Sequence, residues 1–116
     1  MKNVRQSNIN IHKDAWVEIN LEYLAQNIQA IKKIIPANKK MMAIVKADAY
    51  GHGSSMIAPT LLASGVDYLG VASIDEGIEL RNNKFKCPIL VLGAAPIWAF
   101  DYAAQNNISL SIFSQN

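Results

Sequence analysis

Two hydrophobic periods alternate along this chain. Short, nearly continuous apolar runs lie at Met41–Lys46, Tyr68–Ala72 and Ile89–Leu92, and such runs bounded by turn residues are typical of buried strands. The segments between them carry apolar residues every three or four positions, which is the period of an amphipathic helix. Strands and helices that alternate in this way predict an α/β fold whose strands run parallel.

The most regular helical pattern follows Asn20. Its apolar positions are Leu21, Leu24, Ile28, Ile31 and Ile35. Asn20 is expected to cap the start of this helix and Pro36 to end it. Before the helix, Trp16, Val17 and Ile19 predict a first strand.

A second helix is predicted between Ser54 and Ser64, with Gly65 as its left-handed cap. Pro59 leaves two alternatives open, because proline is tolerated in the first turn of a helix but not in its middle. Either the helix begins near Pro59 or it is kinked there.

The remaining elements continue the alternation. Ser73 and Glu76 have the spacing of a capping box, in which each side chain satisfies a backbone donor, and the helix they begin is expected to run to about Arg81. Pro96 is expected to be the first residue of a helix that extends through Ala104. A final strand is predicted because serines alternate with three apolar residues, Ile108, Leu110 and Ile112.

Composition excludes several classes of function. The formal net charge of +2 is too small to indicate binding to nucleic acid or to an anionic membrane. The single cysteine, Cys87, excludes an internal disulfide and fits a reducing compartment. Residues 1–14 form a polar tail that lacks the apolar core of a signal peptide, and no apolar run reaches transmembrane length. We therefore expect a soluble, cytoplasmic protein whose folded part is 15–116.

One lysine lies where α/β enzymes assemble their sites. Lys46 ends an apolar strand, and the loop that follows it contains Tyr50 and His52 between small residues. In parallel sheets and barrels, functional residues gather at the carboxyl ends of the strands. A lysine taken alone at such a position is most often a solvent-exposed side chain, so its neighbours decide the interpretation.

The nine-residue run VKADAYGHG (45–53) resembles the cofactor-lysine motif of the alanine racemase family, whose members are fold-type III enzymes that use pyridoxal 5′-phosphate. The segments AWVEINL (15–21), LGVASIDEGIELR (69–81) and PILVLG (88–93) also follow that family's order and approximate spacing. The resemblance therefore covers nearly the whole chain from Ala15 onward.

The resemblance implies a (β/α)8 barrel of the TIM type, followed in the family by a second β domain. Such a barrel typically needs about 250 residues, whereas this chain has 116. We therefore expect a partial barrel with parallel strands, truncated after about four βα units. Its last strand would be left as an unpaired edge, which parallel sheets normally avoid.

The resemblance also implies roles for three residues. Lys46 would form the Schiff base with pyridoxal 5′-phosphate and, once released, would remove the α proton of an amino-acid substrate. Tyr50 would donate a hydrogen bond to the cofactor phosphate, and Leu92 would pack near the cofactor at the mouth of the barrel. For Leu92, a place in the barrel core without a ligand is an equal alternative.

In the family, the second base is a tyrosine from the partner subunit of a homodimer, and its sequence lies beyond residue 116. None of three tyrosines is assigned that role, namely Tyr23, Tyr68 and Tyr102.

The other residues of the motif have simpler explanations. His52 is expected to make a structural hydrogen bond. Asp48 is expected to bond nearby backbone, and its charge is not required because the family often has asparagine there. The glycines at 51 and 53 need only shape the loop. No site role is expected for Cys87, Trp16, Trp98 or Phe100, of which the aromatic residues are interpreted as packing residues.

Three hypotheses for function remain. The first is an alanine racemase that supplies D-alanine for the cell wall, present here as an amino-terminal portion. The second is a serine or broad-specificity amino-acid racemase, because those enzymes carry closely similar lysine motifs. The third is a truncated product without activity of its own. Small cofactor-carrier proteins of the same fold type are a weaker alternative, because their lysine lies in a different context.

Overall fold

The computed structural model describes residues 3–5 and 15–115 of the chain. The elements in chain order are β1 (Asn3–Arg5), β2 (Glu18–Asn20), α1 (Leu21–Ile34), β3 (Met42–Ile44), α2 (Lys46–Tyr50), α3 (Ser54–Ala63), β4 (Tyr68–Val71), α4 (Ile74–Asn82), β5 (Ile89–Ala94), α5 (Ala99–Gln105) and β6 (Ser109–Ser111).

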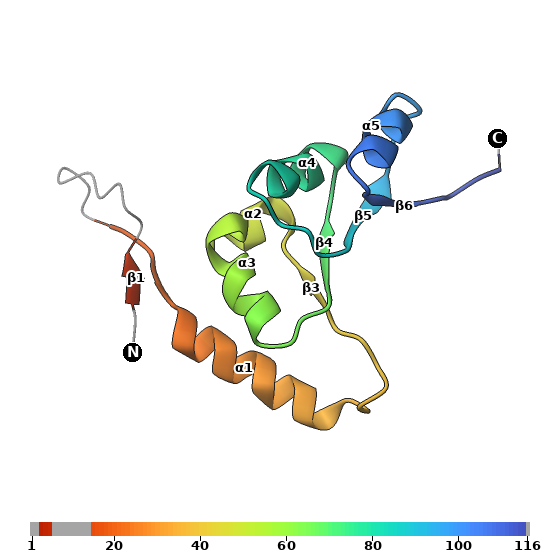
Figure 1. Ribbon diagram of the computed structural model, residues 1–116. Coiled ribbons are helices and arrows are strands. Elements are labelled where there is room, and N and C mark those ends of the chain that lie inside the picture. The colour runs from red at the N-terminus through yellow and green to blue at the C-terminus, as the bar shows by residue number, and fades with distance from the viewer. Residues whose placement is uncertain (1–2, 6–14, 116) are drawn as a thin grey trace.

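A four-stranded sheet in the order β3-β4-β5-β6 forms the centre of the fold (Figure 1). All three strand pairs are parallel, and each strand lies beside the next one in the sequence. Helices α3, α4 and α5 connect consecutive strands. Sequential parallel strands joined by helices are the construction of a (β/α)8 barrel, so the predicted partial barrel is confirmed.

The strand predicted before α1 is shorter than expected and belongs to a different sheet. β2 pairs in the antiparallel sense with β1, which lies inside the predicted polar tail. Trp16 and Val17 precede β2 and are each 56% exposed, so the interpretation of Trp16 as a packing residue is wrong. The Trp16 Nε1 donates a hydrogen bond to Glu18 Oε1 (3.2 Å) instead of packing into the core.

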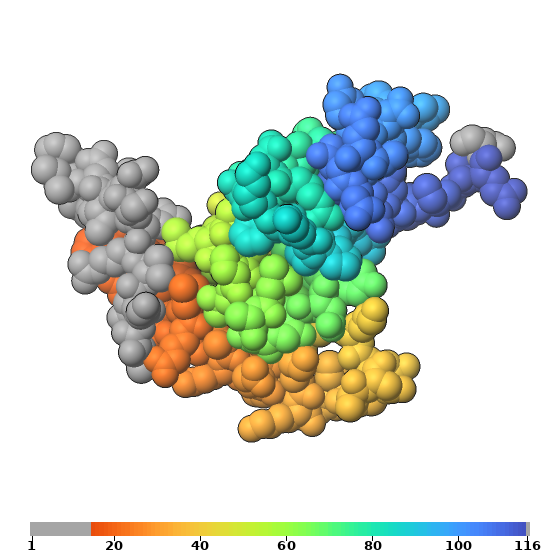
Figure 2. All heavy atoms as spheres, viewed as in Figure 1, coloured from red at the N-terminus to blue at the C-terminus, as the bar shows by residue number. Residues whose placement is uncertain are grey.

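Helix α1 has the predicted start and end. The Asn20 side chain accepts a hydrogen bond from the Tyr23 amide (3.0 Å), and the chain becomes extended at Ile35, immediately before Pro36. The helix packs along α3, where Ile28 is buried. Its last two turns lie at the edge of the molecule, as Figure 2 shows, and the predicted apolar position Ile31 is 47% exposed.

Helix α3 begins at Ser54, so Pro59 lies inside the helix and the alternative of a start near Pro59 is wrong. The helix is closed by Gly65, whose φ of 108° is the predicted left-handed cap. After this residue, the Val66 amide donates a hydrogen bond to the Leu61 carbonyl (3.1 Å). The two following helices close in the same way, with left-handed Lys84 and Asn107.

Three further boundaries differ from prediction. β3 ends at Ile44 rather than at Lys46, because the backbone turns sharply after Val45. α5 begins at Ala99, and Pro96 lies in a preceding turn in which the Ala99 amide donates to the Pro96 carbonyl (2.9 Å). β6 ends at Ser111, and Ile112 beyond it is 69% exposed.

The core lies between the sheet and the helices. Residues of alternate strand positions that are at most 1% exposed form its centre, namely Leu69, Val71, Ile89 and Val91. The opposite face of the sheet carries partly exposed side chains, including Met42, Ile44 and Leu92, which meet around Gly70. No helix among the described residues is long and apolar enough to cross a membrane.

Arg81 joins three segments at the end of α4. Its guanidinium group donates hydrogen bonds of 2.8 Å to four backbone carbonyls, those of Phe85, Cys87, Asn106 and Asn107. These carbonyls lie in the loops before β5 and before β6. The planar fork of arginine suits such a cluster, whereas the single ammonium of lysine does not.

We predict that Arg81→Lys lowers the free energy of unfolding by about 1–3 kcal/mol, because partly buried carbonyl oxygens lose charged donors. Urea unfolding followed by circular dichroism measures this change. Lys86→Gln is the matched control, because Lys86 is an exposed cation in the same loop. Equal unfolding midpoints for Arg81→Lys and the control would contradict the prediction.

Candidate functional site

Lys46 lies at the carboxyl edge of the parallel sheet, two residues after the end of β3. The pairing of β3 with β4 extends one residue further, because the Val45 amide donates a hydrogen bond to the Gly70 carbonyl (2.8 Å). Val45 is only 1% exposed, which anchors the backbone immediately before Lys46. The position predicted for Lys46, at the mouth of the sheet, is confirmed.

The backbone after Lys46 forms a left-handed turn. Residues 47–50 all have positive φ, between 51° and 55°. These values are close to those of the left-handed helix, which costs roughly 1–2 kcal/mol for each residue with a Cβ. Four such residues in succession are unusual, and strain of this kind persists where surrounding contacts impose it. Gly51 and Gly53 follow with φ of 94° and 83°.

Asp48 joins the left-handed turn to the next helix. Its Oδ1 accepts hydrogen bonds from the Ser54 amide (2.9 Å) and from the Ser54 hydroxyl (3.2 Å) at the start of α3. Its own carbonyl accepts from the Gly53 amide (2.9 Å). Asp48 therefore bonds nearby backbone as expected, and it satisfies the amide of Ser54, the first residue of α3, whose N-cap Gly53 has no side chain to do so.

Glu76 contacts the turn from the opposite side. Its Oε2 accepts a hydrogen bond from the Ala47 amide (2.8 Å), and its Oε1 accepts from the Ala72 amide (3.0 Å). The predicted capping box is therefore only half correct. Ser73 Oγ accepts from the Glu76 amide (3.4 Å) as predicted, but the Glu76 carboxylate does not return to the amide of Ser73.

The side chains of Lys46 and Tyr50 lie on the same side of the left-handed turn. The Lys46 Nζ lies 6.0 Å from the centre of the Tyr50 ring. Tyr50 is 65% exposed and Lys46 is partly buried, and both residues follow β3 at the carboxyl edge of the sheet. The structure thus brings together an amine and a phenol that the sequence analysis selected.

Leu92 lies farther away, on β5, two strands from Lys46. It is partly buried, and its Cδ1 lies 3.3 Å from the position that a Cβ on Gly70 would take. Its side chain is therefore on the face of the sheet opposite the helix-covered core. The next residue, Gly93, allows β5 to approach β4 closely, because a Cβ there would lie 2.7 Å from the Ala72 carbonyl oxygen.

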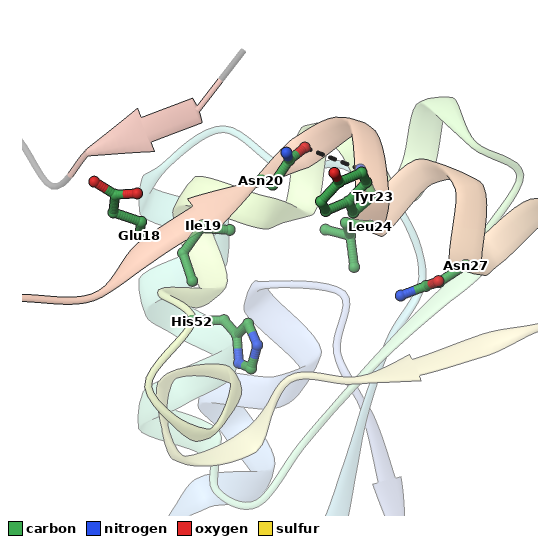
Figure 3. Close-up of a pocket in the computed structure, with 7 residues that line it drawn as sticks. All are labelled: Glu18, Ile19, Asn20, Tyr23, Leu24, Asn27 and His52. Carbon is green, nitrogen blue, oxygen red and sulfur yellow. Dashed lines mark hydrogen bonds between the residues drawn. The ribbon is translucent and has the colours of Figure 1, made fainter. Parts of the chain in front are cut away.

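His52 faces a different cavity, which the sequence did not indicate (Figure 3). This open pocket of about 270 Å³ lies between the start of α1 and the loop that contains His52. The side chains of Ile19 and Leu24 point toward the imidazole ring in Figure 3. His52 Nδ1 lies 2.9 Å from the Ala49 carbonyl, so this nitrogen carries the proton and makes a structural hydrogen bond. The histidine is thus a further contact that holds the left-handed turn.

Cys87 has the properties of a structural thiol. Burial raises the pKa of the Cys87 thiol, and the nearby Arg81 guanidinium opposes this shift in part. The described residues contain no group of three or more histidine, cysteine or acidic side chains that could hold a metal ion. Trp98 and Phe100 are 59% and 44% exposed, so neither packs into the core, and the Trp98 ring instead meets the Tyr102 ring edge to face, with 6.1 Å between their centres.

Two features of the structure define the class of protein. The chain has the first parallel units of a (β/α)8 barrel, and at the carboxyl edge it presents an amine held by a strained turn. The family described as "Alanine racemase, N-terminal domain" matches residues 19–116. The chain belongs to the alanine racemase family and corresponds to the amino-terminal part of its members.

Individual relatives agree with this assignment. Alanine racemase 1 of Oceanobacillus iheyensis is 41% identical over 103 residues, which are 89% of this chain and 27% of that protein. The crystal structure of the Bacillus anthracis alanine racemase with bound L-Ala-P is 37% identical, with a TM-score of 0.79 over 81% of this chain and 24% of that one. A histidine racemase from Leuconostoc mesenteroides is 30% identical, with a TM-score of 0.75 over 81% of this chain and 25% of that one. The chain thus spans about a quarter of the length of these relatives.

We predict that Asp48→Ala destabilises the fold by about 1 kcal/mol, because the amide and hydroxyl of Ser54 at the start of α3 lose their acceptor. Asp48→Asn keeps an oxygen in the same place and is expected to change stability by only a few tenths of a kcal/mol. Urea unfolding of the two variants beside the unchanged chain measures both effects. A loss for asparagine as large as the loss for alanine would show that the charge, and not the hydrogen bond, is the important property of Asp48.

Proposed function

We propose that this chain is the cofactor-bearing portion of an alanine racemase, a cytoplasmic isomerase that interconverts L- and D-alanine with pyridoxal 5′-phosphate. The observation that carries this proposal is the position of Lys46, which the left-handed turn holds at the carboxyl edge of the sheet. That edge is where barrel enzymes bind their substrates and cofactors. Family membership supports the same reaction class.

The residues at this edge fit the chemistry of the cofactor. A primary amine is the group that bonds to an aldehyde, and Lys46 supplies it next to a rigid, buried residue, Val45. A phosphate needs hydrogen-bond donors, and the exposed hydroxyl of Tyr50 supplies one from the same turn. Leu92 would contribute an apolar contact from β5. The donor set therefore has one group for each end of the cofactor.

The proposed mechanism follows from these positions. When bound, pyridoxal phosphate supplies an electron sink that makes the α proton of the amino acid acidic. The ε-amine of Lys46 would hold the cofactor and, as a free amine, would remove or return the α proton of the amino acid on one face. Tyr50 would hold the phosphate end by a hydrogen bond from its hydroxyl, which would keep the amine of Lys46 within reach of the α carbon.

The reaction needs groups that the described chain does not supply. A second base must act on the opposite face of the α carbon, and we assign it to a partner subunit in a homodimer. The proposed biological role is supply of D-alanine for cell-wall precursors.

The second candidate is a racemase for another amino acid, such as serine, or one of broad specificity. A specific observation favours keeping it, since the histidine racemase noted above has nearly the same fold over the same portion. The part of the barrel described here therefore does not by itself distinguish alanine from other substrates.

We predict that pyridoxal 5′-phosphate followed by borohydride labels the chain mainly at Lys46, because this lysine is the amine placed at the carboxyl edge. Peptide mass spectrometry locates the label. Lys46→Ala is the variant that should lose the main labelled peptide. Lys40→Ala is the matched control, because Lys40 is an exposed lysine that precedes the amino end of β3.

Each outcome of this labelling has a definite meaning. Predominant label at Lys46 supports the proposed site. Label spread over many lysines, or unchanged in Lys46→Ala, would mean that this chain forms no organised site and would support the hypothesis of a truncated product without activity.

For the complete enzyme, we predict that alanine is racemised with a kcat/KM at least about tenfold above those of serine, histidine and lysine, since a pocket shaped for one methyl group discriminates by about 1–3 kcal/mol. Circular dichroism of each amino acid measures the rates. Similar values for all four would favour the broad-specificity alternative.

A further inference from the structure

We infer that Glu76 is a positioning residue for Lys46: one carboxylate on α4 holds the backbone at the carboxyl ends of β3 and β4 together and thereby fixes the direction in which Lys46 leaves the sheet. This inference rests on the proposed function of Lys46 and adds a residue to that site. Its evidence is the pair of hydrogen bonds from the Ala47 amide (2.8 Å) and the Ala72 amide (3.0 Å).

The first of these hydrogen bonds acts directly on Lys46. The amide of Ala47 belongs to the peptide unit that begins at the Lys46 carbonyl, and a peptide unit is planar. A contact that holds the Ala47 N–H therefore sets the ψ angle of Lys46. The left-handed turn begins at the next residue, where φ is already 51°. Glu76 thus acts at the point where the chain changes from a strand to a strained conformation.

The second hydrogen bond connects this point to the neighbouring strand. Ala72 follows β4 directly, and β4 is the strand that pairs with β3. The two carboxylate oxygens accept separately, one from each segment. Hydrogen bonds to a charged acceptor are stronger than neutral ones. The single side chain therefore acts as a bridge between adjacent βα loops.

Helix capping does not account for this arrangement. The Ser73 hydroxyl already accepts from the Glu76 amide at the start of α4, so the helix has its side-chain cap. One oxygen of the Glu76 carboxylate accepts from Ala72, the residue before the N-cap of α4, but the other contacts Ala47, which is 29 positions away in the sequence. A contact of that range serves the tertiary structure around Lys46 rather than the local stability of α4.

The test compares Glu76→Gln with two matched controls in the pyridoxal phosphate and borohydride experiment. Glutamine has one acceptor oxygen, so it can serve only one of the two amides. Glu79→Gln removes an equal charge from the next turn of α4, where Glu79 lines the same cavity of about 140 Å³ as Glu76. Ser73→Ala removes the helix cap and leaves the carboxylate in place.

We expect Glu76→Gln to lower the share of label at Lys46 roughly tenfold, the effect of losing one hydrogen bond to a charged group. Amide hydrogen exchange at Ala47 and Ala72 should accelerate by a similar factor. Glu79→Gln should change neither quantity. Ser73→Ala should lower the melting temperature and leave the selectivity for Lys46 unchanged.

The outcomes separate this inference from the proposed function. If the unchanged chain shows no selective label at Lys46, the proposed function fails, and exchange at Ala47 still tests the bridge. If the unchanged chain is labelled at Lys46 and Glu76→Gln is labelled equally well, the positioning role is overturned alone. If the label falls in proportion to melting temperature for both Glu76→Gln and Ser73→Ala, Glu76 is merely structural and the inference is likewise overturned.

Discussion

The left-handed turn after Lys46 is the constraint on which the candidate site depends. Its four residues with positive φ carry strain of about 1–2 kcal/mol each, and each is an L-residue that favours other conformations. Two carboxylates oppose this strain from the two sides: Asp48 bonds to the start of α3, and Glu76 bonds to the first amide of the turn. Hydrogen bonds to charged acceptors contribute about 1.5–3 kcal/mol each, which is comparable with the strain of one residue. The turn is therefore stable only inside this fold, where α3 and α4 are already in place.

The three helices that connect the strands of the sheet all end with the same closure. Helices α3, α4 and α5 all end in a left-handed residue, after which an apolar residue returns its amide to a carbonyl of the last helical turn: Val66 to Leu61 (3.1 Å), Phe85 to Leu80 (3.2 Å) and Ile108 to Ala103 (2.9 Å). Each apolar residue then enters the core before the next strand. This repeated closure sets where each strand begins, so the strands lie in register and their carboxyl ends meet at one edge. The βα units that follow Lys46 in the sequence therefore help to determine where Lys46 lies.

Local patterns predicted most of this fold because local rules govern most of it. The sequence predicted the alternation of strands and helices, the Asn20 cap and the closure at Gly65, and the strand Tyr68–Val71 is one residue shorter than the predicted Tyr68–Ala72. Errors arose where conformation departs from residue preference. The strand expected to reach Lys46 ends early because tertiary contacts impose a left-handed turn. The closures at Lys84 and Asn107, for which the sequence made no prediction, use left-handed residues other than glycine. Exposure of Trp98 and Phe100 could not be predicted either, since a hydrophobic period shows which residues share a face but not whether anything covers that face.

The candidate site shows the same division between local and tertiary information. Lys46 and Tyr50 were found because their motif is contiguous, and their proximity follows from four residues of one turn. Glu76 was assigned a purely local role because serine followed by glutamate three residues later is the usual signature of a capping box. In the structure, the serine alone caps the helix, which leaves the carboxylate available to the loops that follow two adjacent strands. A motif that satisfies a helix locally can thus conceal a contact between distant segments, and only the register of β3 against β4 reveals which amides the carboxylate can reach.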